Sequence, residues 1–345
     1  VGDITVTGGS LSNFASTDSD TYTVRFTPTA DGATTINVAA NGYTDAGSNN
    51  NTASAEFNWT QDDTVPTVSG VSSTTTAGSY TAADAISIQV TFTEAVTVSG
   101  TPQLTLETGG SDAVVNYASG SGSTVLTYTY TVGAGENSSD LDYASTGALA
   151  LNGGTINDAA GNAATLTLAT PGAAGSLGAN EALVIDTTAA TVSGVSSGTD
   201  DGTYTTDGVI SITVTFTEAM TVTGSPQLTL ETGGSDAVVN YSSGSGSTVL
   251  KFSYTVAAGQ NSTDLDYAST GALALNGGTI KDAAGTAATL TLATPGAAGS
   301  LAANKALVVD TQGPSVTGVS STTAAGTYNS GDAISIQVTF DEAVT

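Results

Sequence analysis

The sequence repeats itself with a period of 124 residues. The segment TPQLTLETGG at Thr101 returns as SPQLTLETGG at Ser225, and residues 62–185 match residues 186–309 at 97 of 124 positions without a gap. Solenoid repeats are about 20–50 residues long, whereas 124 residues is the length of a small domain. The chain is therefore a tandem array of similar domains. Such arrays usually supply length, reach or multivalency rather than a single active site.

The repeat divides the chain into four parts. Two are full copies, a third copy begins at Asp310 and stops at Thr345, and a shorter unit of another type occupies the N-terminal residues. In that shorter unit we predict only the later strands of a sandwich, at 3–8, 21–28, 33–40 and 52–60. Partial units at both ends are what we expect of a segment cut from a longer array. The expected domains are 1–61, 62–185, 186–309 and 310–345.

Charge and composition exclude several classes of function. The chain has 31 acidic and 4 basic residues and a net charge of −27, so it lacks the Lys and Arg that bind nucleic acid or anionic membranes. It has no His and no Cys, which removes disulfides, His or Cys metal ligands, thiol nucleophiles and Ser-His-Asp triads. No apolar run approaches the roughly 18 residues of a membrane span. We therefore predict no nucleic-acid binding, no membrane insertion in this segment and no enzymatic activity.

Apolar and polar residues alternate along most of the chain, as they do in half-buried β-strands. Residues 85–92, for example, place Ile86, Ile88, Val90 and Phe92 on one face. Clusters of Gly, Asn, Asp and Ser separate these runs, and no stretch has a convincing helical period. We therefore predict an all-β fold built of antiparallel β-sandwiches. In the first full copy the predicted strands are 67–72, 84–93, 96–106, 113–118, 123–132, 147–156 and 163–186.

An up-and-down order of these strands decides which loops meet. The start of each copy, the loop after residues 84–93 and the loop after residues 147–156 then share one end of the sandwich, which we call the leading end. The connection from Asp186 to Thr191 is about five residues long, too short for a flexible tether. We therefore expect neighbouring sandwiches to lie end to end.

Three kinds of short motif carry a resemblance to a known family. They are the joint DDTVPTV from Asp62, the strand endings TFTEAVTV from Thr91, TFTEAMTV from Thr215 and TFDEAVT from Thr339, and the loops NDAAGN from Asn157 and KDAAGT from Lys281. Together they resemble the bacterial immunoglobulin-like (Ig-like) repeats of giant, repetitive extracellular proteins, such as biofilm-associated adhesins. The resemblance covers essentially the whole chain. It implies tandem Ig-like sandwiches on a bacterial or archaeal cell surface, and it implies calcium at the joints between domains.

The predicted topology gathers acidic residues at the leading end of each copy. In the first copy these are Asp62, Glu94 and Asp158, with Asn162 in the same loop as Asp158. Ca²⁺ takes about 6–8 oxygen ligands, which three carboxylates and nearby backbone carbonyls could supply. Residues 62–185 contain 11 acids and no Lys or Arg, so these carboxylates would repel one another without a cation. The equivalent predicted ligands are Asp186, Glu218 and Asp282 in the second copy, where Thr286 replaces Asn162, and Asp310 and Glu342 in the third.

A second, weaker set of acids is expected at the opposite end of each sandwich. It consists of Asp112, Asp140 and Asp142, beside Glu136, in the first copy. The spacing Asp-Leu-Asp would place two carboxylates on one face of an extended segment. The counterparts in the second copy are Asp236, Asp264 and Asp266. For both sets the alternative is that the residues are solvated turn acids, because Asp and Asn favour turns through local hydrogen bonds.

We interpret the chain as part of an extracellular structural array: a stalk, fibre or matrix scaffold with calcium at its joints. Its partners would be the neighbouring repeats of the same chain. Two alternatives stay open. A self-assembling filament or surface-layer subunit would bind other copies of itself, and a binding module would recognise surface glycans or a receptor through clustered aromatic residues. A glycosidase, which paired carboxylates could suggest, would need an aromatic-walled pocket, and aromatic residues are only 6% of this chain.

Overall fold

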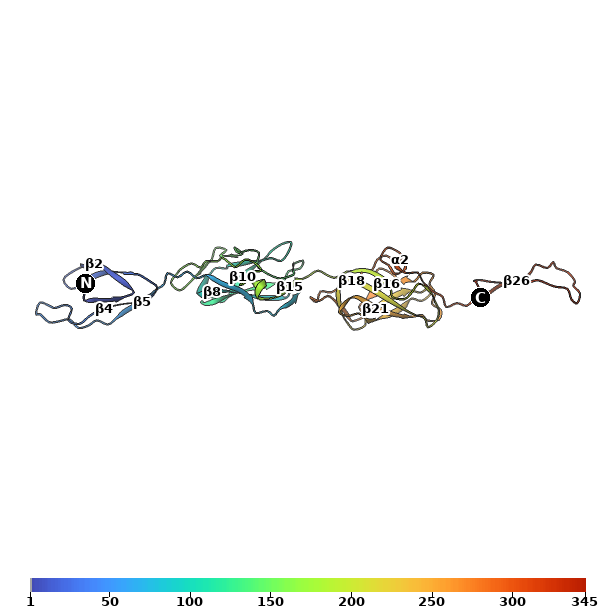
Figure 1. Cartoon of the computed structure of the whole chain (residues 1–345), viewed down its shortest axis with the longest axis horizontal. Helices are drawn as coiled ribbons and strands as arrows, with labels where there is room; N and C mark the ends of the chain where they lie inside the picture. The colour runs from blue at the N-terminus through green and yellow to red at the C-terminus, as the bar shows by residue number, and fades with distance from the viewer. Residues whose placement is uncertain (1) are drawn as a thin grey trace. The chain divides into compact units, whose positions relative to one another are not determined.

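The computed structural model describes residues 2–345, and nearly all of its regular structure is β-strand (Figure 1). Contacts within the chain divide it into two compact units, one ending at Thr187 and the other running from Thr188 to Thr345. Each unit contains the hydrophobic core of one full copy of the repeat. The predicted all-β fold of tandem β-sandwiches is therefore confirmed.

In the first full copy the strands wrap around a single core. They are hydrogen-bonded in the order β13-β9-β10-β11-β8-β14, with β6 also paired to β8. Both β8 and β10 change partner along their length, which lets the strands enclose the core from two sides. The elements are β6 (Val68–Ser73), β7 (Gly78–Tyr80), β8 (Ala85–Ser99), β9 (Gln103–Leu106), β10 (Ala113–Ser119), β11 (Ser123–Thr131), β12 (Asn137–Ser138), β13 (Leu149–Ala150), β14 (Thr155–Asn157), α1 (Leu177–Asn180) and β15 (Leu183–Asp186).

The alternation seen in the sequence decides which side chains form this core. Ile86, Ile88 and Val90 are fully buried, whereas the residues between them are only half-buried. From the neighbouring strand β11, Tyr128 and Tyr130 pack into the same cluster. A period-two pattern therefore predicted the buried face of the longest strand correctly.

Several strand boundaries in the first copy differ from the predicted ones. Strand β8 continues through the predicted break between 84–93 and 96–106, because no Gly or Pro stands before Gly100, whose φ of +74° ends it. The predicted strand 147–156 is divided into β13 and β14 by a turn at Asn152, with φ of +48°. Of the predicted strand 163–186 only β15 forms a regular strand, and Ala163 and Thr165 make isolated β-bridges.

A one-turn helix, α1, precedes β15 where the sequence predicted no helix. Ser176 caps it, because its hydroxyl accepts a hydrogen bond from the Ala179 N–H. Four residues are too few to show a helical period in the sequence. The helix packs against β6 and helps to close the sandwich.

The last strand of the copy makes a parallel pair that the up-and-down prediction did not contain. Strand β15 pairs with the short strand β7, with Leu183 beside Gly78 and Ile185 beside Tyr80. On its other edge β15 pairs in antiparallel fashion with β12. The first and last parts of the copy are thus hydrogen-bonded side by side.

The second full copy repeats this arrangement in the second unit. Its core cluster extends from Ala190 to Val309, and its terminal strands β17 and β25 again pair in parallel. Its elements are β16 (Val192–Ser197), β17 (Gly202–Tyr204), β18 (Val209–Thr223), β19 (Gln227–Glu231), β20 (Ala237–Ser243), β21 (Ser247–Thr255), β22 (Asp266–Tyr267), β23 (Leu273–Ala274), β24 (Thr279–Lys281), α2 (Leu301–Asn304) and β25 (Leu307–Val309).

The two partial units are simpler. Near the N-terminus, one sheet has the order β1-β4-β5 and another contains β2 and β3, with Phe26 and Trp59 in edge-to-face contact at 4.8 Å. Strand β2 was not predicted. After residue 310 the two expected strands form one antiparallel pair. The elements are β1 (Ile4–Thr7), β2 (Gly9–Ser16), β3 (Tyr22–Pro28), β4 (Gly32–Val38), β5 (Phe57–Gln61), β26 (Val316–Ser321) and β27 (Ile336–Phe340).

Candidate metal centres

Three acidic residues from distant parts of the first copy lie together. Asp62 follows β5, Glu94 lies within β8, and Asp158 directly follows β14. One carboxylate oxygen from each lies within 4.8 Å of the others. Asp62 and Glu94 are half-buried, and Asp158 is buried. The sequence therefore predicted correctly that these three side chains meet, although calcium binding itself stays a prediction.

Glu94 was expected at the end of a strand, but it lies within an irregular part of β8. The strand pairs with β11 up to Thr91 and again at Val96, and it pairs with β14 from Thr97 onward. Glu94 lies in the break of register between Thr91 and Val96. Irregular strand segments of this kind re-aim side chains and are common beside functional sites.

Hydrogen bonds from its own loop hold the Asp158 carboxylate in place. Oδ1 accepts the N–H groups of Gly161 at 2.7 Å and Asn162 at 2.8 Å, and Oδ2 accepts the Asn162 side-chain amide at 2.8 Å. Burial raises the pKa of Asp158, but the hydrogen bonds from Asn162 and Gly161 outweigh it and leave that pKa below its usual value. Asp158 therefore stays ionised inside the cluster.

Asn162 was predicted as a ligand, which stays a prediction, and its side-chain nitrogen has a positioning role. Its amide nitrogen lies 3.0 Å from the carbonyl oxygen of Asp62 and 3.4 Å from that of Thr64, besides its bond to Asp158. Asn162 therefore joins the loop to the start of the copy, about 100 residues earlier in the chain. In this way it helps to bring Asp62 and Asp158 together.

Glu94 carries the unbalanced charge of the first cluster. Its Oε1 atom is buried and has no hydrogen-bond partner. Burial raises the pKa of Glu94, and the negative charges of Asp62, Asp158 and Asp31 raise it further. A buried carboxylate oxygen without a donor is costly unless a proton or a cation compensates it, so this donor set fits a hard cation such as Ca²⁺.

Asp31 belongs to the surroundings of this cluster and was missed in the sequence. Its carboxylate accepts the Asp63 N–H at 2.8 Å and the Thr64 hydroxyl at 2.6 Å. The hydrogen bonds from Thr64 and then Asp63 lower the pKa of Asp31. No sequence pattern links Asp31 to the joint, because the contact arises only when the turn before β4 folds against it.

The second set, Asp186, Glu218 and Asp282, repeats the composition and burial of the first. Glu218 lies within β18 and Asp282 follows β24, the same places in the fold as Glu94 and Asp158. Asp282 is 3% exposed, and its Oδ1 accepts the Thr286 N–H at 2.9 Å. Its Oδ2 has no hydrogen-bond partner, because Thr286 has no amide to match Asn162.

The residues predicted at the third joint are less enclosed. Asp310 follows β25 and Glu342 follows β27, and both line one open pocket together with Glu231 and Asp341. Asp341 also accepts the Ser315 N–H at 2.7 Å. Within residues 2–345 no third acid joins Asp310 and Glu342 in a close group.

The second predicted set separates into two places. Asp142 is buried and its oxygens accept the N–H groups of Tyr143 and Gly172, both at 2.9 Å. Asp140 lies beside it at the start of α1, since a Cβ on Gly178 would sit 3.2 Å from Asp140 and 3.1 Å from Asp142. Asp112 instead lines a groove between β10 and β11 with Glu136.

In the second copy this set fits a cation less well. Asp266 accepts the N–H groups of Tyr267, Gly296 and Leu301, and Ala302 occupies the place of Gly178. Asp236 lines a groove beside Gln260 rather than a glutamate. Asp264 belongs to no close acidic group among the residues described. Asp142 and Asp266 therefore act as hydrogen-bond acceptors for the backbone of the loop and helix around them.

Comparison with known proteins supports the fold in part of the chain. Residues 1–60 match a family model described as a bacterial Ig-like domain. Such domains are typically structural or adhesion modules at bacterial surfaces and are typically not enzymes. No curated protein and no solved structure matches the chain. None of the helices in the described residues is long and apolar enough to cross a membrane.

Proposed function

We propose that this chain is a segment of an extracellular, load-bearing stalk or fibre whose joints bind calcium. The observation that carries the proposal is the pair of buried carboxylate oxygens without hydrogen-bond partners, on Glu94 and Asp282. Each belongs to a cluster of three acids. A bacterial Ig-like match at residues 1–60 supports a structural role at a cell surface.

Asp62, Glu94 and Asp158 would hold the ion in the first copy, with backbone carbonyls and water completing its oxygen ligands. Calcium would supply the positive charge that the 11 acids of residues 62–185 lack. Asn162 would keep the ligands in position through the hydrogen bonds of its side-chain nitrogen. Because these ligands come from both ends of the copy's sequence, an ion would restrict movement of the Asp62 segment against the sandwich.

A second candidate function is sugar recognition by the N-terminal unit. Phe14 and Tyr22 stack with ring centroids 5.4 Å apart and interplanar angle 10°, and they are 40% and 57% exposed. Tyr43 and Phe57 line the same pocket. Exposed aromatic faces stack on sugars, so Tyr22→Ala should abolish any retention on a glycan array if this candidate is correct. Self-association and glycan partners otherwise stay predictions.

Calcium-dependent stability of the whole chain tests the main proposal. A ligand that binds only the folded state at 100 times its Kd stabilises that state by about 2.7 kcal/mol. We expect the melting temperature to rise in millimolar Ca²⁺ and to fall back on chelation. Glu94→Gln should remove the calcium response of the first copy, whereas the exposed Glu107→Gln should not. Identical melting with calcium and with chelator would refute the proposal.

A further inference from the structure

The two ends of each full copy are joined by a parallel pair of strands. In the second copy Gly202 lies beside Leu307 and Tyr204 beside Val309. The Gly202 N–H donates to the Ala306 carbonyl at 3.1 Å, and the Asp310 N–H donates to the Tyr204 carbonyl at 3.0 Å. Strand β17, near the start of the copy, therefore lies directly beside β25 at its end, and both run in the same direction.

This geometry decides how tension acts on the copy. A pull on the preceding chain first acts on β16, which pairs with β18, and acts on β17 from its first residue once β16 has been drawn away. A pull on the following chain acts on β25 from its last residue. Because the strands run in the same direction, these opposite pulls slide one strand along the other. All hydrogen bonds of the pair then bear load together, whereas a pull across the strands would break them one at a time.

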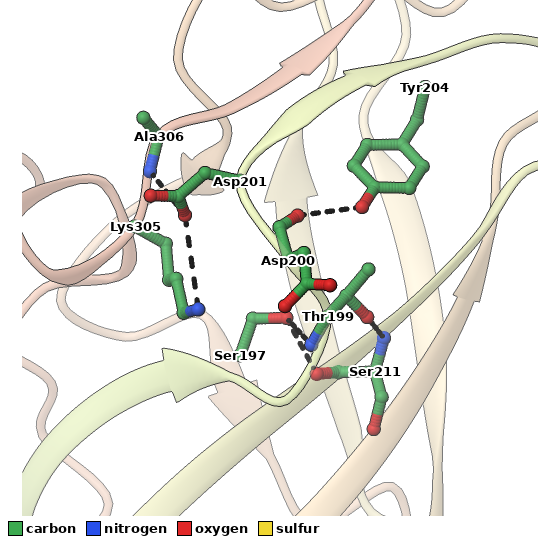
Figure 2. A network of polar contacts seen from close by, with 8 residues as sticks. All are labelled: Ser197, Thr199, Asp200, Asp201, Tyr204, Ser211, Lys305 and Ala306. Atoms are coloured by element: carbon green, nitrogen blue, oxygen red, sulfur yellow. Dashed lines mark hydrogen bonds and ion pairs between the residues drawn. The ribbon is translucent and has the colours of Figure 1, made fainter.

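We infer that Asp201 and Lys305 reinforce the pair β17–β25, here called the clamp, against tension in the second copy only. The inference rests on the proposed load-bearing function. Asp201 precedes β17, and its Oδ1 accepts the Ala306 N–H at 3.2 Å (Figure 2). The same oxygen lies 3.8 Å from Nζ of Lys305, which precedes β25. One carboxylate therefore links the starts of both clamp strands.

The turn that carries Asp201 is itself held to the sandwich. The Ser197 hydroxyl donates to the Ser211 carbonyl at 2.9 Å and accepts the Thr199 N–H at 3.0 Å, and the Thr199 hydroxyl accepts the Ser211 N–H at 2.8 Å. The Tyr204 hydroxyl donates to the Asp200 carbonyl at 2.6 Å. Figure 2 shows these bonds around the same turn. Load on Asp201 is therefore passed to β18, a central strand of the copy.

The first copy has the same turn without the reinforcement. Ser73, Thr75 and Ser87 form the matching hydrogen bonds. At the positions of Asp201 and Lys305, however, the first copy has Ala77 and Glu181. The side chain of Ala77 has no oxygen to accept a hydrogen bond, and the side chain of Glu181 has no positive charge. The first copy should therefore yield to tension before the second.

Single-molecule stretching of the full chain from its two ends tests this inference. At constant force we expect two unfolding events of equal length and unequal lifetime. Asp201→Ala should shorten the longer lifetime roughly tenfold, since it removes a charge-assisted hydrogen bond and the ion pair. Lys305→Ala should shorten it roughly two- to fivefold, because an exposed ion pair is weak. Asp201→Asn should resemble Lys305→Ala.

Two further experiments distinguish a mechanical clamp from ordinary stabilisation: one moves the residue pair into the first copy, and the other changes the direction of pulling. The double variant Ala77→Asp with Glu181→Lys should lengthen the shorter lifetime. Since the chain has no Cys, handles at Thr206→Cys and Gln312→Cys can load the clamp across its strands, and unfolding should then be faster at the same force. An unchanged lifetime in Asp201→Ala, or equal lifetimes in both directions, would overturn the inference. Both readouts are taken with chelator present, so failure of calcium binding would not imitate failure of the clamp.

Discussion

The side-chain amide of Asn162 donates a 2.8 Å hydrogen bond to Oδ2 of Asp158. At the equivalent place in the second copy Thr286 has no amide, and Oδ2 of Asp282 is buried without a partner. A single substitution between two nearly identical copies thus changes how much of an acidic cluster the protein itself satisfies. The second cluster should depend on a cation more than the first.

Exchanging these two residues should exchange the calcium dependence. Without calcium, Thr286→Asn should stabilise the second copy by about 1 kcal/mol, because it supplies a donor to a buried oxygen. Asn162→Thr should destabilise the first copy by a similar amount and enlarge its response to calcium. Hydrogen exchange followed by mass spectrometry can measure each copy separately. Equal exchange rates for Thr286→Asn and the parent chain in chelator would contradict the prediction.

The stability of the calcium-free first copy should depend on pH through Glu94. The folded state raises the pKa of Glu94 above its ordinary value of 4.5. Such a group adds stability below its unfolded pKa, and that stability is lost as pH rises through the folded pKa. In chelator, the first copy should therefore become more stable as the pH falls from neutral toward 4.5. Glu94→Gln should lack this rise.

The pH range of this experiment has a lower limit. The pKa values of Asp31 and Asp158 are lowered from 3.8, so protonation of these residues at still lower pH destabilises the fold. Thermal unfolding measured above pH 3.8 therefore reports the effect of Glu94 without that of Asp31 and Asp158. If the stability of the parent chain only declines as the pH falls from neutral, the charge on Glu94 does not destabilise the folded state.

Tyr128 should be replaceable by phenylalanine with a gain in stability. Its side chain is fully buried and its hydroxyl has no hydrogen-bond partner, and the second copy already has Phe252 at this position. Tyr128→Phe should stabilise the first copy by about 1 kcal/mol, since it removes an unsatisfied polar group. Tyr130→Phe is the matched control: its hydroxyl donates to Glu136 at 2.7 Å, so it should cost about 1 kcal/mol. Urea unfolding can measure both, and opposite signs are the expected result.

Asp142 should stabilise the first copy whether or not calcium is present. Its two oxygens accept backbone N–H groups of Tyr143 and Gly172. Asp142→Asn should cost about 1.5–3 kcal/mol, the range for hydrogen bonds to charged groups, in both calcium and chelator. The neighbouring Asp140→Asn should change stability by less than about 0.5 kcal/mol, as is usual at exposed sites. A loss confined to calcium-containing buffer would instead assign Asp142 to a second metal site.

Several features of this protein could be predicted from local patterns alone. Alternation along residues 85–92 predicts a buried Ile86, Ile88 and Val90, because side chains of an extended strand point to opposite faces in turn. The repeat of 124 residues predicts two copies of one fold. Antiparallel strand order also predicts that Asp62 and Asp158 meet, because it assigns each loop to one end of the sandwich. These predictions need only neighbouring residues and strand order.

Other features depend on which surfaces pack together in the folded copy. The parallel pairing of β7 with β15, the approach of Asp31 to Thr64, and the buried Oε1 of Glu94 have no local sequence signal. Each depends on residues far apart in the chain. These residues come together because the free energy gained by packing the sandwich core outweighs the entropy lost in closing the chain between them. The unbalanced charge on Glu94 arises from the same burial that stabilises the fold. Alternation along a strand can predict where a carboxylate will be, but only the packed structure decides whether anything neutralises it.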